Sequence, residues 1–148
     1  MKIEGARVLV TGGGRGIGKC FAQMFLDGGA KVMVCDINTD DLAKVEAEAK
    51  DAGKEILTAK CNVADEADVQ ATFAKMADAF GGIDVLINNA GITRDGMFLK
   101  AKDGEIKTMS LKNWQMVIDV NLTGTFLCAR EAATLMVKNN NPGVIVNI

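Results

Sequence analysis

A cluster of glycines follows the first apolar run of the chain and could bind phosphate. The sequence from Val8 to Gly18 reads VLVTGGGRGIG, an apolar segment that passes through a turn into a helical pattern. Glycine has no Cβ, so the backbone can bend sharply and approach a pyrophosphate, whose charge is met by the N–H groups and dipole of the helix. We assign this role to Gly12, Gly16 and Gly18. The spacing differs from the commoner GxGxxG, and the string alone also fits an ordinary turn.

An acidic residue, Asp36, ends the second apolar run. A carboxylate at this place can accept hydrogen bonds from both hydroxyls of an adenosine ribose and would repel a 2′-phosphate. The sequence therefore favours NAD over NADP as the cofactor. NADP stays open as the cofactor, because Arg15, within the glycine turn, could reach a 2′-phosphate. A purely structural role of Asp36 also stays open, since this residue could simply begin a turn with Asn38.

Apolar runs alternate with amphipathic segments of helical length along the chain, which predicts an α/β fold with a doubly wound parallel sheet between two helical layers. The first helix is expected to bury one face that carries Ile17, Cys20, Phe21, Met24 and Phe25. We expect one domain over residues 1–148 and a strand order of 3-2-1-4-5. The predicted strands are 7–11, 31–36, 56–62, 85–88 and 144–148, and the predicted helices are 16–27, 38–53, 69–80 and 110–138.

Composition excludes several other classes of function. The net charge is −2 with no block of like charges, which argues against nucleic acid or an anionic membrane as a partner. No apolar run approaches the roughly 18 residues of a membrane span. The chain has no histidine, so His-based metal sites and Ser-His triads are excluded, and no metal is predicted. Four scattered cysteines are expected to be buried free thiols in a cytoplasmic protein.

The segment 92–109 is rich in charged residues and is predicted to be a long surface loop. Such loops often border a substrate site when they follow a parallel strand, but a solvated insertion without a special role fits equally well.

Taken together, these motifs resemble the short-chain dehydrogenase/reductase family. The resemblance covers essentially the whole chain and rests on TGGGRGIG at 11–18, Asp36, CNV at 61–63, DVLINNAG at 84–91, Asn121 and VIVNI at 144–148. It implies a Rossmann fold, a nicotinamide cofactor, and small carbonyl or alcohol substrates. The cofactor-binding residues that it implies are Thr11, Gly12, Arg15, Gly16, Ile17, Gly18, Asp36, Ile37, Asn62, Val63, Asn89, Ala90 and Gly91.

The resemblance also implies one catalytic residue in this chain, Asn121, whose backbone carbonyl would hold a water molecule of the proton relay. The family more often has Asp where this chain has Asn62. The string NNAGITRD at 88–95 is most similar to the 3-oxoacyl-carrier-protein reductase branch, but Asp36 and the insertion at 101–108 depart from it. The activity of a hydroxyacyl-CoA dehydrogenase or of another secondary-alcohol dehydrogenase therefore remains an alternative.

Family members use a tyrosine, a lysine and a serine for proton transfer and substrate orientation, and this chain contains no tyrosine. We therefore expect it to be the N-terminal part of a longer enzyme. The alternatives are a short, non-catalytic dinucleotide-binding module and a structural or interaction role. The family also implies a homo-oligomer, a dimer or tetramer, joined through the helix at 110–138.

Overall fold

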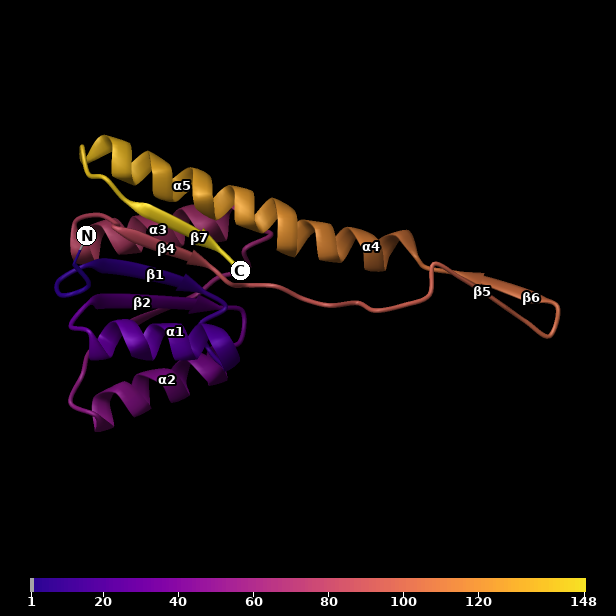
Figure 1. The fold of residues 1–148 in the computed structure, drawn as a ribbon, viewed down its shortest axis with the longest axis horizontal. Coiled ribbons are helices and arrows are strands. Elements are labelled where there is room, and N and C mark those ends of the chain that lie inside the picture. Colours follow the sequence, from indigo (N-terminus) through magenta and orange to yellow (C-terminus); the bar gives the residue numbers. More distant parts are fainter. Residues whose placement is uncertain (1) are drawn as a thin grey trace.

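A five-stranded parallel sheet forms the centre of the computed structural model, which describes residues 2–148 (Figure 1). Its strand order is β3-β2-β1-β4-β7, with every neighbouring pair parallel, so the predicted order is confirmed. Helices cover both faces, as in a Rossmann fold. The strands are β1 (Arg7–Thr11), β2 (Lys31–Asp36), β3 (Ile56–Lys60), β4 (Val85–Asn88) and β7 (Val144–Asn147). The helices on the sheet are α1 (Gly16–Asp27), α2 (Thr39–Asp51), α3 (Glu66–Phe80) and α5 (Thr125–Lys138).

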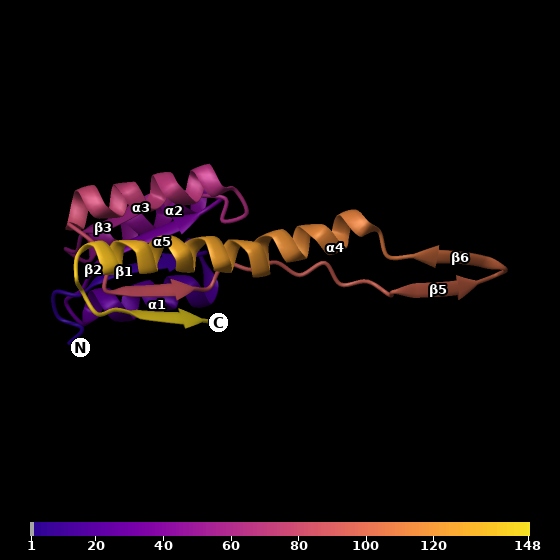
Figure 2. The ribbon, with the colours of Figure 1, turned by 90° about the horizontal axis from the view of Figure 1, so that it is seen from above.

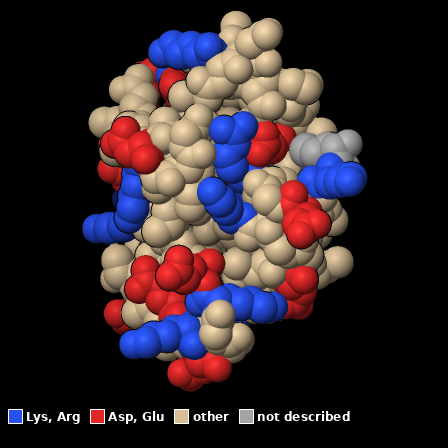
Figure 3. Space-filling view, turned by 90° about the vertical axis from the view of Figure 1, so that its left-hand side faces the viewer, with Lys and Arg blue, Asp and Glu red and all other residues tan. Residues whose placement is uncertain are grey.

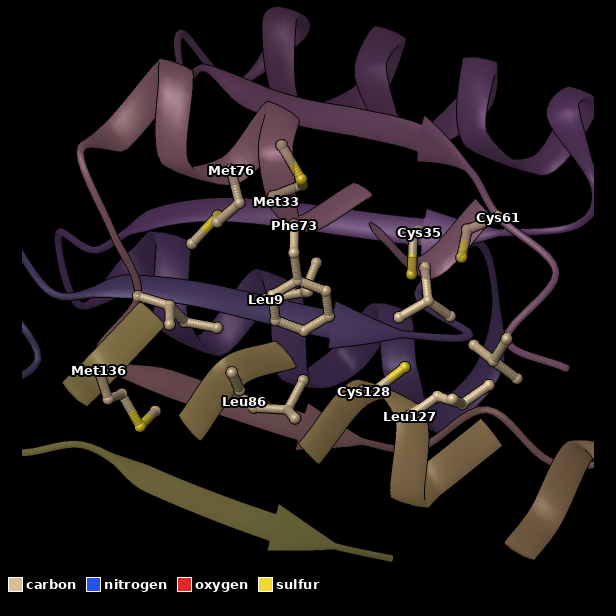
Figure 4. Close-up of a cluster of buried hydrophobic side chains, with 14 residues drawn as sticks. Leu9, Met33, Cys35, Cys61, Phe73, Met76, Leu86, Leu127, Cys128 and Met136 are labelled. Carbon is tan, nitrogen blue, oxygen red and sulfur yellow. The ribbon is translucent and has the colours of Figure 1, made fainter. Parts of the chain in front are cut away.

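Alternate residues of each central strand enter two separate hydrophobic cores. Val8 and Val10 of β1 pack against α1 and α2, whereas Leu9 between them packs against α3 and α5 (Figure 4). Each residue of such a strand therefore lies in an apolar layer, which explains the nearly continuous Val, Ile and Leu content of the strands.

The first helix is rotated relative to the sequence prediction. Phe21 and Phe25 pack against the core as predicted, but Ile17 is 63% exposed and Met24 is 68% exposed. The residues of α1 that are buried against the sheet are Gly18, Ala22 and Leu26. Small residues at the contact let α1 approach β1 closely, and apolar character alone does not reveal this requirement. Cys20, on the outer side of the same helix, is also exposed, so the prediction that all four thiols are buried is wrong for this one.

The single helix predicted at 110–138 consists of three connected parts. An α-helix, α4 (Leu111–Ile118), passes into a π-helical turn, η1 (Asp119–Gly124), and then into α5. A π-turn is rare and often marks a functional site. The third strand also ends earlier than predicted, at Lys60, because Asn62 forms a turn there: its side-chain Oδ1 accepts from the N–H of Ala64 at 3.1 Å.

The segment 92–109 is a surface excursion as predicted, but part of it is ordered as a β-hairpin. Strands β5 (Leu99–Lys102) and β6 (Glu105–Thr108) pair antiparallel and project away from the sheet, beyond the start of α4 (Figure 2). Asp103 and Gly104 both have positive φ, as a tight two-residue hairpin turn requires. Within residues 2–148, no helix is long and apolar enough to cross a membrane.

At the opposite end of the molecule, acidic and basic side chains lie side by side (Figure 3). The Arg7 guanidinium donates to both carboxylate oxygens of Asp84 at 2.8 and 2.7 Å, and the Asn141 side chain donates to the same carboxylate. These hydrogen bonds, with that from Arg7 first, hold the pKa of Asp84 well below its usual value. The cluster joins the starts of β1, β4 and β7.

We expect Asp84→Asn to lower the free energy of unfolding by about 1–3 kcal/mol at pH 7, because the variant loses charge-assisted hydrogen bonds. A lowered folded-state pKa stabilises the protein above the unfolded pKa, about 4. The difference between wild type and variant should therefore shrink as the pH falls below about 4. Urea unfolding at pH 7 and pH 3 measures both effects. The control Asp103→Asn alters an exposed carboxylate 4.0 Å from Lys102 and should leave the free energy of unfolding unchanged at both pH values.

Candidate functional site

A cleft of about 400 Å³ opens at the carboxyl ends of β1, β2 and β4. The chain runs outward in opposite directions from β1 and β4, so this is the switch point where open α/β sheets bind ligands. Thr11 and Asn121 lie outside the lining, and every other residue of the predicted site lies within it. The residues that line the cleft are Gly12, Arg15, Gly16, Ile17, Gly18, Asp36, Ile37, Cys61, Asn62, Val63, Asn89, Ala90, Gly91, Ile92 and Val120.

Close packing fixes the glycine turn at the base of the cleft. A Cβ at Gly18 would collide with the carbonyl oxygen of Gly12 and would lie 2.5 Å from the side-chain nitrogen of Asn89. A Cβ at Gly13 would lie 2.6 Å from the side chain of Val34. The start of α1 therefore lies directly against the ends of β1 and β4. The role of Gly13 was missed by sequence reasoning, because it depends on a neighbouring strand.

Gly16 differs from these residues because the space around it is open. Its φ is +56°, and apart from its chain neighbours and the backbone of its own helix no protein atom lies within 4 Å of a Cβ built on it. The helix that begins here has no side-chain cap from Arg15, whereas Asn38 caps α2 and Asp65 caps α3. Helix N-termini without a cap present free N–H groups to a ligand, and an anion satisfies both these groups and the helix dipole. The residues present thus fit a diphosphate.

Thr11 supports the cleft from below. Its hydroxyl accepts hydrogen bonds from the N–H groups of Asn89 and Ala90, both at 3.0 Å. The Asn89 side chain donates in return to the carbonyl oxygens of Thr11 at 3.0 Å and Gly12 at 3.1 Å. These reciprocal bonds join the glycine turn to the end of β4, so the two walls of the cleft keep a fixed separation.

Asp36 stands at the edge of the cleft with its carboxylate held in place. One oxygen accepts from the N–H of Gly14 and the other from the N–H of Asn38, both at 3.1 Å. Asn38 also caps α2, so the predicted turn at Asn38 exists together with a carboxylate that lines the cleft. Arg15 lies exposed on the same cleft lining.

Asn62 and Val63 line the cleft beyond the end of β3. The N–H of Asn62 donates to Asp68 at 2.9 Å, and its side-chain oxygen accepts from the N–H of Ala64. An aspartate would accept the latter bond equally well, so the asparagine preserves this part of the turn.

Asn121 fixes the position of Ile92, which lines the cleft beyond the end of β4. Its side chain accepts from the N–H of Ile92 at 2.9 Å and donates to the carbonyl oxygen of Ile92 at 3.0 Å. Its own carbonyl oxygen accepts from the Thr125 hydroxyl at 2.8 Å. The π-turn that carries Asn121 packs closely on the cleft, since a Cβ at Gly124 would lie 2.7 Å from the side chain of Val63.

Sequence reasoning missed three lining residues, Cys61, Ile92 and Val120. Cys61 and Ile92 belong to the quoted strings CNV at 61–63 and NNAGITRD at 88–95, so membership in these motifs was an available signal. Val120 was hidden within a pattern that predicted a continuous helix. A second hollow, of about 390 Å³, lies on the charged face of the β5–β6 hairpin and includes none of the predicted site residues.

Comparison with known proteins agrees with this geometry. Residues 6–148 match the family model for short chain dehydrogenases. The chain belongs to the short-chain dehydrogenase family. It is 43% identical over 141 residues to a 3-oxoacyl-[acyl-carrier-protein] reductase of Synechocystis sp., covering 95% of this chain and 53% of the relative.

Two solved structures resemble the chain closely. A short-chain type dehydrogenase/reductase of Mycobacterium marinum is 34% identical with a TM-score of 0.86, covering 99% of this chain and 56% of the other. A family member of Burkholderia phymatum, in complex with NAD, is 28% identical with a TM-score of 0.86, covering 99% of this chain and 50% of the other. The chain spans about half the length of the curated relatives it matches.

We expect Thr11→Val to destabilise the protein by about 1–3 kcal/mol, because it leaves two N–H groups at the end of β4 without their acceptor. Thr11→Ser keeps the hydroxyl and loses one methyl group, so its cost should be about 1 kcal/mol. Urea unfolding of the three proteins measures the difference. Equal losses in the two variants would show that the hydroxyl does not join the strands.

Proposed function

We propose that the protein is an oxidoreductase that transfers a hydride between a nicotinamide dinucleotide and a secondary alcohol or ketone. The observation that carries this proposal is the cleft at the switch point, where an uncapped helix start and the open Gly16 offer N–H groups to a diphosphate. When bound, the nicotinamide would give or take the hydride. The roles of residues 2–148 are to bind the dinucleotide, exclude water from it and orient it.

We further propose NAD as the preferred cofactor. The fixed carboxylate of Asp36 can accept the ribose hydroxyls and disfavours a 2′-phosphate by charge and by shape. The Burkholderia relative in complex with NAD is compatible with this preference. Asp36 would outweigh Arg15, because its carboxylate is held by two backbone N–H groups whereas Arg15 is exposed.

A 3-oxoacyl or 3-hydroxyacyl thioester is our proposed substrate class, on the strength of the similarity to the Synechocystis reductase. Asn121 is proposed to serve the proton relay through its backbone carbonyl, which the bonds to Ile92 would hold at the cleft wall. We also propose a cytoplasmic homo-oligomer, joined through the exposed apolar side chains of Trp114, Leu122 and Phe126 along α4, η1 and α5.

A non-catalytic binding module is the second candidate, because the 148 residues contain no tyrosine to act as proton donor. A protein that contains this chain together with a proton donor should oxidise NADH in the presence of 3-oxoacyl thioesters, as followed by absorbance. Tight NADH binding without turnover for any ketone or thioester would favour the binding module instead.

Gly16→Ala should raise the dissociation constant of NADH at least about tenfold, a loss of roughly 1.4 kcal/mol, because the new Cβ enters the cleft. Gly53→Ala is a matched control: its φ is +69°, and its Cβ also meets nothing within 4 Å, but it lies at the end of α2. Both substitutions should cost about 1–2 kcal/mol of stability through the positive φ. Only Gly16→Ala should weaken binding, as measured by NADH fluorescence titration, and equal effects on binding would refute the assignment.

Asp36→Ala should shift the ratio of NADPH to NADH affinity toward NADPH by about tenfold or more, since it removes a charge that repels the 2′-phosphate. Asp36→Asn keeps the size and removes the charge, so it separates electrostatics from shape. Titration of each variant with both cofactors measures the ratio. If that ratio stays at the wild-type value in both variants, Asp36 does not select the cofactor.

A further inference from the structure

Two buried thiols lie next to each other below the nucleotide cleft. Cys35 is the fifth residue of β2, and Cys61 directly follows β3 and lines the cleft (Figure 4). Both are free thiols, and Cys61 is only 3% exposed. The proposed hydride transfer uses neither of them.

The register of the sheet brings the two thiols to the same face. Cys35 of β2 is paired with Ala59 of β3, and Cys61 lies two residues after Ala59. Residues two apart along a strand point to the same face, so the side chains of Cys35 and Cys61 both point into the core between the sheet and α3. The N–H of Cys61 donates to the carbonyl oxygen of Asp36 at 3.0 Å, which extends the strand pairing past the last residue of β3. The thiols are therefore diagonal neighbours at the end of the ladder, within one buried cluster.

The two thiols differ in acidity. The interaction with the neighbouring Cys61 thiol, together with complete burial, raises the pKa of Cys35 well above its usual value. The same interaction lowers the pKa of Cys61, against the effect of burial and of the nearby carboxylates of Asp68 and Asp65. Cys61 is thus the thiol more readily present as a thiolate, which is the nucleophilic form.

We propose that Cys61 and Cys35 form an oxidisable dithiol, at which a small hydroperoxide makes a disulfide that displaces the lining of the nucleotide cleft. The Cys61 thiolate attacks the hydroperoxide, the O–O bond breaks, and Cys61 becomes a sulfenic acid while an alcohol or water leaves. The sulfur of Cys35 then attacks that of Cys61, the S–O bond breaks, and water leaves with the Cys35 proton. Two thiols and one hydroperoxide give one disulfide, one alcohol or water, and one water.

The disulfide changes the cleft because it requires movement. Neighbouring strands lie about 4.8 Å apart and rise about 3.3 Å per residue, so diagonal neighbours two residues apart have Cα atoms about 8 Å apart, whereas a disulfide favours about 5.5–6 Å. Cys35 lies within a central strand and is fixed, so the segment at Cys61 must shift toward β2. Asn62 and Val63 follow directly and line the cleft, so they move with it. This inference rests on the proposed function in one respect, namely that the cleft binds a dinucleotide.

The other two cysteines provide internal comparisons. Cys20 is exposed on the outer side of α1, away from the sheet. Cys128 is buried on α5, and burial first of all raises its pKa to about 12. Exposure alone would make Cys20 the most readily oxidised thiol, whereas the dithiol predicts that Cys61 and Cys35 are oxidised together.

The test treats the reduced, purified protein with a few equivalents of hydrogen peroxide and digests it with trypsin without reduction. The four cysteines fall in four different tryptic peptides, 20–31, 32–44, 61–75 and 113–130. We expect mass spectrometry to find peptides 32–44 and 61–75 joined, NADH to slow this reaction at least fivefold, and dithiothreitol to reverse it. The oxidised protein should bind NADH at least tenfold more weakly than the reduced protein.

Two variants separate the steps. Cys35→Ala removes the resolving thiol, so the joined peptides should disappear and dimedone should label peptide 61–75 as a trapped sulfenic acid. Cys128→Ala, the matched control at a buried thiol, should leave the joined peptides unchanged. Because the linkage is also measured on the wild-type protein, poor folding of a variant does not remove the test.

Three results would overturn the inference: oxidation of Cys20 while Cys35 and Cys61 stay reduced, a link from Cys61 to Cys128, or a Cys35–Cys61 disulfide that leaves NADH affinity unchanged. Failure of the reduced protein to bind NADH would instead overturn the proposed function. Formation of the disulfide is measured without nucleotide, so the two failures are distinguishable.

Discussion

The reciprocal hydrogen bonding between Thr11 and Asn89 is the constraint on which the rest of the site depends. The ends of β1 and β4 are adjacent in the sheet, but the chain continues from β1 toward β2 and from β4 toward β7 on the other side. A crevice therefore opens where the pairing of the two strands stops. The Thr11 hydroxyl and the Asn89 amide bridge that crevice at its base. Without this bridge, the buried backbone groups at the two strand ends would lack partners.

Two glycines let the segments around the cleft pack closely on this hydrogen-bonded base. Gly18 lets the start of α1 reach the bridge, and Gly124 lets the π-turn pack on Val63. Asn121 then ties the same turn to Ile92, because its side-chain amide forms two hydrogen bonds with the backbone of Ile92. The start of α1 and the π-turn are thus each held in place by a glycine that allows close packing and by the side-chain amide of an asparagine. The π-turn provides the extra residue that lets one helix serve both the cleft and the hydrophobic core.

The opposite end of the sheet is fixed by charge. Arg7, Asp84 and Asn141 form a partly buried cluster where three strands begin. The cleft and this charged cluster therefore lie at opposite ends of the strands, and the carboxyl ends are where open α/β sheets bind ligands. This separation leaves the uncapped start of α1 free of competing acidic partners from that cluster.

The sequence by itself determined the strands, the glycine turn and the place of Asp36, because local patterns encode them: continuous apolar runs, residues without a Cβ, and a carboxylate at a strand end. The strand order followed from these strands through the general topology of doubly wound sheets. Only the tertiary structure decided the rotation of α1, the π-turn and the ordered hairpin. The rotation depends on which residues are small enough to meet the sheet, and the π-turn on packing against Val63. The contact between Cys35 and Cys61 was equally hidden, since strand register, a long-range property, brings together residues that lie far apart in the chain.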